Sequence, residues 1–150
     1  MRAWRGYQKI RAELNAHLAR QLAADSGLSE ADYAVLVAVS ESPGERIRWR
    51  DLCRVLGWGA SRLSHQIHRM ETRGTVERIA CEDDGRGYDV VLTDIGLAAI
   101  EEAAPLHAAA VRHCFADVLT SQQLDALGDI ADAITGHLAM HHSDESDRRD

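Results

Sequence analysis

The sequence lacks any long uninterrupted run of apolar residues. No stretch approaches the ~20 apolar residues that a helix needs to cross a membrane. The first residues, MRAWRGYQKIRAEL, also lack the apolar segment of a secretory signal peptide. We therefore expect a cytoplasmic protein that has no membrane partner.

Cysteine is scarce, and its spacing argues against two classes of small protein. The three cysteines are widely separated and form no C-x-x-C pair: Cys53, Cys81 and Cys114. An odd number without close pairs indicates neither a disulfide framework nor a zinc knuckle. We expect buried free thiols at all three positions.

Motifs of the common enzyme classes are also missing. The patterns G-x-S-x-G, G-x-x-x-x-G-K-[ST], G-x-G-x-x-G and H-E-x-x-H do not occur. The histidines and cysteines fall on separate predicted elements, with no evident pairing of a base with a nucleophile. The sequence therefore predicts no catalytic residues, no cofactor and no enzymatic activity.

Metal binding through histidine is an alternative that the sequence leaves open. Two predicted C-terminal helices carry His107, His113, His137, His141 and His142. Histidines one helical turn apart, such as the pair at 137 and 141, can share a zinc ion. Because no third ligand is fixed by the spacing, we predict no defined metal site, and a metal-responsive regulator is a secondary hypothesis.

What the sequence does contain is basic charge concentrated in its central third. The net charge of −7 argues against a nucleic-acid partner, because phosphate contacts require Lys and Arg. Residues 46–86, however, carry nine basic and six acidic side chains, whereas residues 1–45 carry five and six, and residues 87–150 three and twelve. All nine are arginines, which suit the bidentate recognition of phosphate and guanine.

Two helical patterns lie in this basic third and are joined by Gly-Trp-Gly. The first covers residues 51–56 and the second about 60–73, an arrangement typical of a helix-turn-helix. In the second helix Leu63, Ile67 and Met70 share the face toward the core. The rest of its surface is rich in hydrogen-bond donors: Ser61, Arg62, Ser64, His65, His68 and Arg69.

A β-hairpin is predicted after this helix. Residues 76–82 and 88–93 show alternating patterns, and they flank the turn sequence Asp-Asp-Gly-Arg-Gly at 83–87. The predicted fold class is therefore mainly α with a small β-hairpin wing (α+β), a winged helix-turn-helix. Arg86 is expected at the tip of the wing.

Amphipathic helices flank this winged segment on both sides. We predict N-caps or capping boxes at Ser29 with Asp32, at Thr93, and at Thr120 with Gln123, and a kink at Pro105. The apolar stripes need a partner, and pairing with a second copy across a two-fold axis is favoured over an intramolecular bundle. The expected organisation is a helical dimerisation region at 1–24 and 94–142, a DNA-binding domain at 25–93 and a disordered tail at 143–150.

The segment from Leu52 to Thr93 resembles the MarR (multiple antibiotic resistance regulator) family. The resemblance includes the helix-turn-helix, the pattern M-E-x-R-G-x-V-x-R at 70–78 and the pattern D-x-R-x-x-x-V-x-L-T at 84–93. It implies a homodimeric transcriptional regulator of double-stranded, pseudo-palindromic operator DNA, with recognition helices in major grooves and wings in minor grooves. Such proteins are often repressors that a small-molecule effector releases.

The resemblance also implies roles for individual residues. It makes Arg86 the reader of the minor groove and Asp84 its orienting partner, although Asp84 also suits a plain turn. On the recognition helix we expect Arg62 to contact guanine, and phosphates to be held by Ser61, Ser64 and Arg69. His65 suits either role. Gln66 is expected either to reach a base or to be partly buried.

Two points stay open at the level of the sequence. An effector pocket lined by Trp4, Tyr7, His17 and Tyr33 is one interpretation of these residues, and a place in the apolar core is the other. A winged-helix module that binds protein is the rival to DNA binding. The polar recognition helix argues against it, because protein-docking faces use aromatic or apolar anchors.

Overall fold

The computed structural model describes residues 1–80 and 87–147, with side chains for 1–80 and 87–139. Contacts divide the chain into two units, Met1–Ala110 and Val111–Asp150. None of the described helices is both long and apolar enough to span a bilayer. The first unit contains the predicted winged helix-turn-helix.

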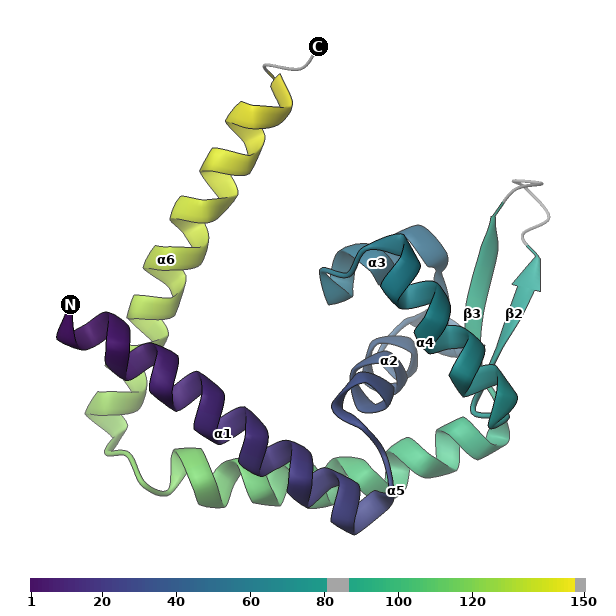
Figure 1. The fold of residues 1–150 in the computed structure, drawn as a ribbon, viewed down its shortest axis with the longest axis horizontal. Helices are drawn as coiled ribbons and strands as arrows, with labels where there is room; N and C mark the ends of the chain where they lie inside the picture. The colour runs from purple at the N-terminus through teal and green to yellow at the C-terminus, as the bar shows by residue number, and fades with distance from the viewer. Residues whose placement is uncertain (81–86, 148–150) are drawn as a thin grey trace. The chain divides into compact units, whose positions relative to one another are not determined.

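The first unit is mostly helical with a small antiparallel sheet, which confirms the predicted fold class (Figure 1). The strand order is β1-β3-β2. The elements in chain order are α1 (Arg2–Ser26), α2 (Glu30–Ser40), a 3₁₀ turn (Pro43–Glu45), β1 (Arg46–Arg48), α3 (Trp49–Leu56), α4 (Ala60–Thr72), β2 (Val76–Ala80), β3 (Tyr88–Leu92) and α5 (Asp94–Val111).

Local sequence signals set most of the helix ends. Gly27, in the left-handed conformation at φ 71°, ends α1. The predicted capping box is present at the start of α2, because Asp32 N donates to Ser29 Oγ and Ser29 N donates back to the Asp32 carboxylate. Thr93 caps α5 as predicted, since Gly96 N donates to its Oγ at 3.1 Å.

Strand β1 and the early start of α3 differ from the sequence prediction. The sequence patterns assigned no element to Arg46–Arg48, and α3 begins at Trp49 instead of Asp51. The strand pairs with β3 in a register that places Ile47 opposite Val90. A three-residue strand is too short to show alternation, so only its distant partner defines it.

One apolar core holds together the residues from α2 to β3, which we call the head. Its fully buried side chains come from α2, α3, α4 and the sheet, and the largest are Val35, Leu36, Val39, Leu52, Leu63, Ile67, Met70, Val76 and Val90. Each of these elements contributes one face to the core. The opposite faces of α3 and α4 are thereby left to solvent.

The sheet is joined to α5 by a close backbone approach. Thr93 Oγ1 donates to Gly74 O at 2.5 Å, and Thr93 N donates to Thr75 O at 3.3 Å. A Cβ atom added at Gly96 would lie 1.9 Å from Thr75 O. Gly96 is therefore required by the packing of α5 against the start of the hairpin.

The second unit consists of a π-helical turn, Arg112–Ala116, and α6, Ser121–Asp147. Thr120 and Gln123 form the predicted capping box, with Thr120 N donating to Gln123 Oε1 at 2.9 Å. The helix continues past His142 to Asp147, where the sequence predicts a disordered tail. Adding residues to an existing helix is easier than nucleating one, so polar residues are carried along in it.

Replacing Gly96 by alanine should destabilise the protein by about 1–3 kcal/mol or more, because the backbone oxygen of Thr75 cannot move away without opening the hairpin. Chemical denaturation followed by circular dichroism measures this change. Gly6→Ala is the matched control. No atom lies within 4 Å of the Cβ position of Gly6, and alanine there should be neutral or stabilise the helix by about 1 kcal/mol. Equal stability of the two variants would contradict the packing described.

Candidate nucleic-acid interface

Helix α4 separates a buried face from an exposed polar face. Leu63, Ile67 and Met70 are completely buried, as their spacing predicts. The six donor-bearing residues predicted for the outer surface are all exposed: Ser61, Arg62, Ser64, His65, His68 and Arg69. Their exposure is established by this geometry, and their contacts with DNA stay a prediction.

Gln66 belongs to the buried face. Its side chain is 2% exposed, and its Nε2 donates to Asp32 Oδ1 at 2.6 Å. Its Oε1 accepts a hydrogen bond from Arg69 Nη2. Of the two sequence interpretations, burial is therefore the one that the structure supports, and Gln66 positions Arg69 instead of facing outward.

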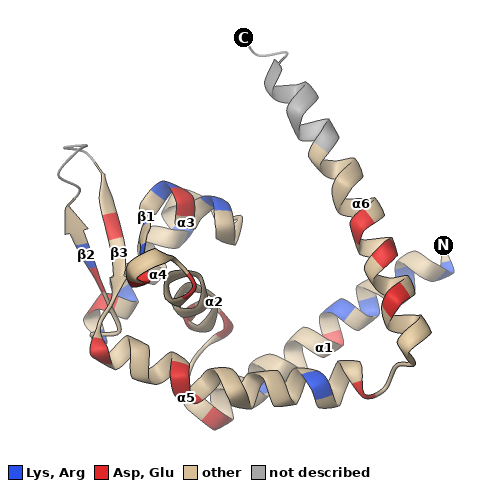
Figure 2. Ribbon diagram, turned by 180° about the vertical axis from the view of Figure 1, so that it is seen from behind, with Lys and Arg blue, Asp and Glu red and all other residues tan. Residues whose placement is uncertain are grey.

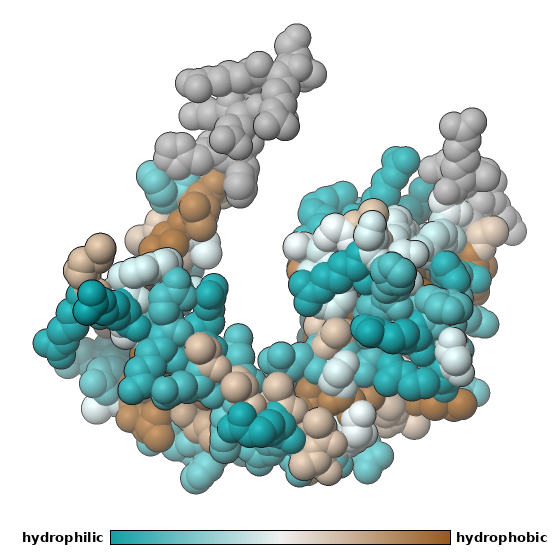
Figure 3. Space-filling model, in the orientation of Figure 1, coloured by the Kyte–Doolittle hydropathy of each residue, from teal (hydrophilic) through white to brown (hydrophobic). Residues whose placement is uncertain are grey.

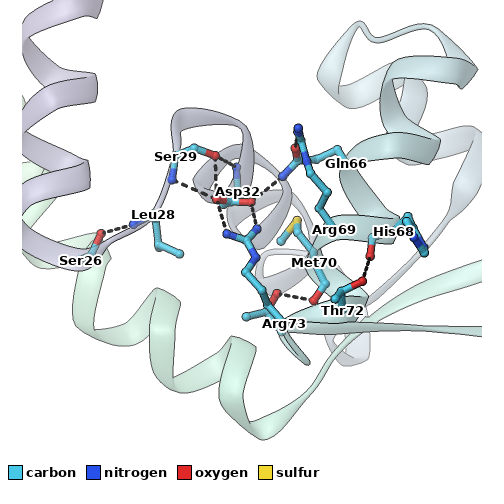
Figure 4. Close-up of polar contacts among 11 residues, drawn as sticks. Ser26, Leu28, Ser29, Asp32, Gln66, His68, Arg69, Met70, Thr72 and Arg73 are labelled. Atoms are coloured by element: carbon cyan, nitrogen blue, oxygen red, sulfur yellow. Dashed lines mark hydrogen bonds and ion pairs between the residues drawn. The ribbon is translucent and has the colours of Figure 1, made fainter.

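Asp32 is the centre of a polar network that joins α2 to α4 (Figure 4). Its carboxylate is buried, and it accepts hydrogen bonds from Ser29 N and Oγ at 3.0 and 2.7 Å, from Gln66, and from both terminal nitrogens of Arg73. Burial by itself would raise the pKa of Asp32, but the hydrogen bonds from Arg73 and Ser29 outweigh it and lower the pKa to about 2. The carboxylate is therefore ionised at any physiological pH.

This network positions the recognition helix at two points. Gln66 lies near the middle of α4, whereas Arg73 immediately follows its last residue. Both are fixed to the first turn of α2 through one carboxylate. Through Gln66 the network also reaches Arg69 on the exposed face. The sequence signal for it was the capping-box residue Asp32, but the partners on α4 are more than thirty positions away.

Ion pairs divide the arginines of the basic third into two groups. Four are paired with carboxylates, namely Arg46 with Asp89, Arg54 with Asp51, Arg73 with Asp32 and Arg78 with Glu71. In the described part of the chain, no carboxylate pairs with the other four, Arg48, Arg50, Arg62 and Arg69. Among the eight described arginines of this third, the unpaired ones therefore lie at the starts of α3 and α4 and on the outer face of α4.

Arg48 and Arg50 are candidate contacts that the sequence prediction did not select. Arg48 is the N-cap residue of α3 and Arg50 lies in its first turn. Both are exposed. Figure 2 shows basic residues on α3 and β1, whereas α5 carries only acidic ones. The signal in the sequence was the density of arginine after residue 45.

The base of the predicted wing is well defined. β2 and β3 are paired from Val76 with Leu92 to Ala80 with Tyr88. The Tyr88 ring contacts Trp49 of α3, with ring centroids 4.8 Å apart. The two wing residues selected from the sequence, Asp84 and Arg86, lie outside the described residues.

Two ring contacts involve the candidate effector residues. Trp4 and Tyr7 stack on each other along α1 and are exposed, as is His17. Tyr33 instead packs against His107 of α5 with ring centroids 4.6 Å apart. The Nδ1 atom of His107 is buried and has no hydrogen-bond partner in the described part of the chain.

The remaining histidines and cysteines form no recognisable metal site in the part of the chain with described side chains. No group of three or more His, Cys, Asp or Glu side chains comes together there. The side chains at 141 and 142 fall outside it. Cys53 and Cys114 are free thiols, and both are only partly buried, contrary to the expected full burial; Cys81 lies outside the described residues.

Asp32→Asn should remove a contribution to stability that depends on pH. Because the pKa of Asp32 is about 2 when folded and 3.8 when unperturbed, its contribution is complete above about pH 5 and is lost as the pH falls toward 2. The difference in unfolding free energy between wild type and Asp32→Asn should therefore shrink by about 1 kcal/mol between pH 6 and pH 3. Urea denaturation at pH 6 and pH 3 tests this. The exposed Glu30→Gln is the matched control, and a difference that does not change with pH would contradict the ion pair.

Comparison with known proteins agrees with this geometry. A sequence model of the MarR family matches residues 26–87. Among solved structures, AbsC, a MarR family transcriptional regulator from Streptomyces coelicolor, is 40% identical with a TM-score of 0.86, and the match covers 91% of this chain and 92% of AbsC. Sco3205, a MarR family regulator from the same organism solved in complex with DNA, is 38% identical with a TM-score of 0.86 over 91% and 86% of the two chains.

A more distant match concerns the fold alone. A variant of MarR from E. coli complexed with operator DNA is 22% identical, with a TM-score of 0.80 over 89% and 94% of the two chains. No curated protein sequence matches significantly.

The matched relatives are transcriptional regulators and not enzymes, as the absence of catalytic motifs predicted. Because both Streptomyces proteins exceed 30% identity over nearly their full length, this chain belongs to the MarR family of transcriptional regulators.

Proposed function

We propose that two copies of this chain bind a pseudo-palindromic operator and repress transcription until a small molecule releases them. The observation that carries the proposal is the outer face of α4, where six exposed polar side chains stand on a helix whose other face is locked into the core. The DNA complex of Sco3205 supports it. A regulator of this kind acts where DNA is, and we place it in the cytoplasm.

In this proposal the first half of α4 enters the major groove. Arg62 contacts guanine O6 and N7 through its planar fork of donors, which is the commonest specific contact of arginine with a base. Ser61, Ser64 and Arg69 hold phosphates, and His65 contacts either a base or a phosphate. Support comes from the exposure of all five side chains, and no carboxylate among the described residues competes for Arg62 or Arg69.

The wing is proposed to reach the adjacent minor groove. Arg86 enters the groove, where a narrow A·T-rich segment concentrates negative potential, and Asp84 orients its guanidinium. The regular pairing of β2 with β3 supports this role, because it fixes the two strand ends, Ala80 and Tyr88, that residues 81–87 connect.

Arg48 and Arg50 extend the proposed contact to the DNA backbone. In a helix-turn-helix the first helix crosses the phosphate chain, and α3 occupies that position here. Both arginines are exposed at its start and have no carboxylate partner among the residues described. They therefore offer two positive charges to the DNA backbone.

Dimerisation is proposed to use α1 and α6. Trp4, Tyr7 and Ile10 are more than half exposed on α1. On α6 an apolar row at intervals of three and four is also exposed: Leu127, Ile130, Ile134 and Leu138. Figure 3 shows hydrophobic surface along the described part of this helix. Such stripes on a soluble regulator call for a partner surface. A symmetric dimer also presents two recognition helices about one helical turn, ~34 Å, apart.

Release by an effector is proposed to involve α2 and α5. The contact between Tyr33 and His107 is the feature that supports it, because the buried Nδ1 of His107 lacks a hydrogen bond that a polar ligand would supply. This contact joins α2 of the DNA-binding head to α5, the helix that leaves the wing.

Substitutions of three arginines should affect DNA binding in two different ways. Arg62→Ala should reduce discrimination between the operator and a scrambled duplex by about 1–3 kcal/mol. Arg69→Ala and Arg48→Ala should each weaken both duplexes alike and lower the salt slope by about one. Titrations at several salt concentrations, with a duplex selected from random DNA, measure both quantities. Arg20→Ala on α1 removes an exposed arginine elsewhere and should leave both unchanged; identical behaviour of all four variants would refute these roles.

Ile134→Glu should convert the dimer into a folded monomer. Ile134 is 54% exposed in the single chain, so a carboxylate there costs little in the monomer but would be buried without a partner in the dimer. Light scattering after size exclusion gives the mass, and circular dichroism confirms folding. Asp132→Ala, on the opposite side of α6, is the control and should remain dimeric. A dimeric Ile134→Glu protein would exclude this face as the interface.

A further inference from the structure

Arg62, the proposed reader of guanine, is held by an aromatic ring. Its Cζ lies 4.1 Å from the centroid of the Trp58 ring, which is closer than the other two arginine–aromatic contacts among the described residues, at 5.4 and 5.9 Å. Trp58 lies in the turn between α3 and α4, and Arg62 is in the first turn of α4. The stack therefore sits at the entrance of the recognition helix.

Trp58 itself is fixed from two sides. Gly57 ends α3 in the left-handed conformation, at φ 63°, and this brings Trp58 N within 3.0 Å of Cys53 O. The indole is half-buried and packs against the apolar core. Arg62, in contrast, is exposed, and no carboxylate pairs with it within the described ranges. A rigid ring thus restrains an otherwise mobile side chain.

A ring restrains arginine differently from a carboxylate. A carboxylate such as Asp32 occupies the in-plane N–H groups of the guanidinium it binds, as it does for Arg73. Stacking on an aromatic face uses the flat surface and leaves the edge donors free. Those edge donors are the groups that bidentate recognition of guanine requires.

We infer that Trp58 is a positioning residue for sequence specificity: it holds the guanidinium of Arg62 in place while leaving its donors free for a base. This inference rests on the proposed function. Because ordering the long side chain before binding lowers the entropic cost of the contact, its loss should affect the specific complex more than the non-specific one. This difference between the specific and non-specific complexes distinguishes Trp58 from residues that only maintain the fold.

The test is a double-mutant cycle on the full chain, using a duplex selected from random DNA by the wild type and a scrambled duplex of equal length. Trp58→Leu should lower the ratio of the two affinities by about three- to tenfold, with unchanged non-specific affinity and salt slope. Trp58→Phe should lie between Trp58→Leu and wild type. In the Arg62→Ala background Trp58→Leu should have no further effect. Trp49→Leu, the same change in a tryptophan that contacts Tyr88 instead, controls for loss of an aromatic side chain.

Several outcomes would overturn the inference. Equal weakening of both duplexes would make Trp58 purely structural, and additive effects of the two substitutions would separate it from Arg62. Tighter specific binding by Trp58→Leu would mean that the stack withdraws Arg62 from DNA. If Trp58→Leu does not fold, the comparison of Trp58→Phe with wild type decides. A wild type that selects no sequence refutes the proposed function itself, and with it this role.

Discussion

The DNA-binding head depends on the hydrogen bonds that the buried carboxylate of Asp32 accepts from Gln66 and Arg73. Apolar packing of Leu63, Ile67 and Met70 holds α4 against the core, but such packing alone is non-directional and tolerates rotation and sliding of a helix. Hydrogen bonds to Gln66 and Arg73 are directional, and they fix both the rotation and the position of α4 relative to α2. The outer face of the helix is therefore presented in one orientation.

Ion pairing, more than composition, determines which arginines of this chain present an unpaired positive charge. Half of the described arginines of the basic third serve the fold through carboxylates, and the other half face solvent without them. Acidic residues dominate α5 and α6, which accounts for a negative chain that nevertheless carries a cationic surface. For a DNA-binding protein, the local field at the contact surface matters more than the net charge.

Patterns that act over a few residues predicted most of the fold, and contacts between distant residues account for what was missed. The capping residues Ser29, Thr93 and Thr120 were recognisable because their partners lie within three positions. Strand β1 was not, because its only definition is its pairing with β3. The same limit applies to the site: the exposed face of α4 followed from helical periodicity, whereas the tie from Gln66 to Asp32 spans thirty-four positions. The role of Arg48 required knowledge of which other arginines are neutralised.

The division of α4 into a buried face and an exposed face allows regulators of this kind to diversify. Every residue that determines where the helix sits points inward or lies at its end, so the outer positions carry almost no structural duty. Side chains there can be exchanged one at a time with little effect on folding, and exchanges at positions that contact bases would alter DNA preference. After gene duplication, one scaffold can therefore acquire new operators by single steps, without passing through unfolded intermediates.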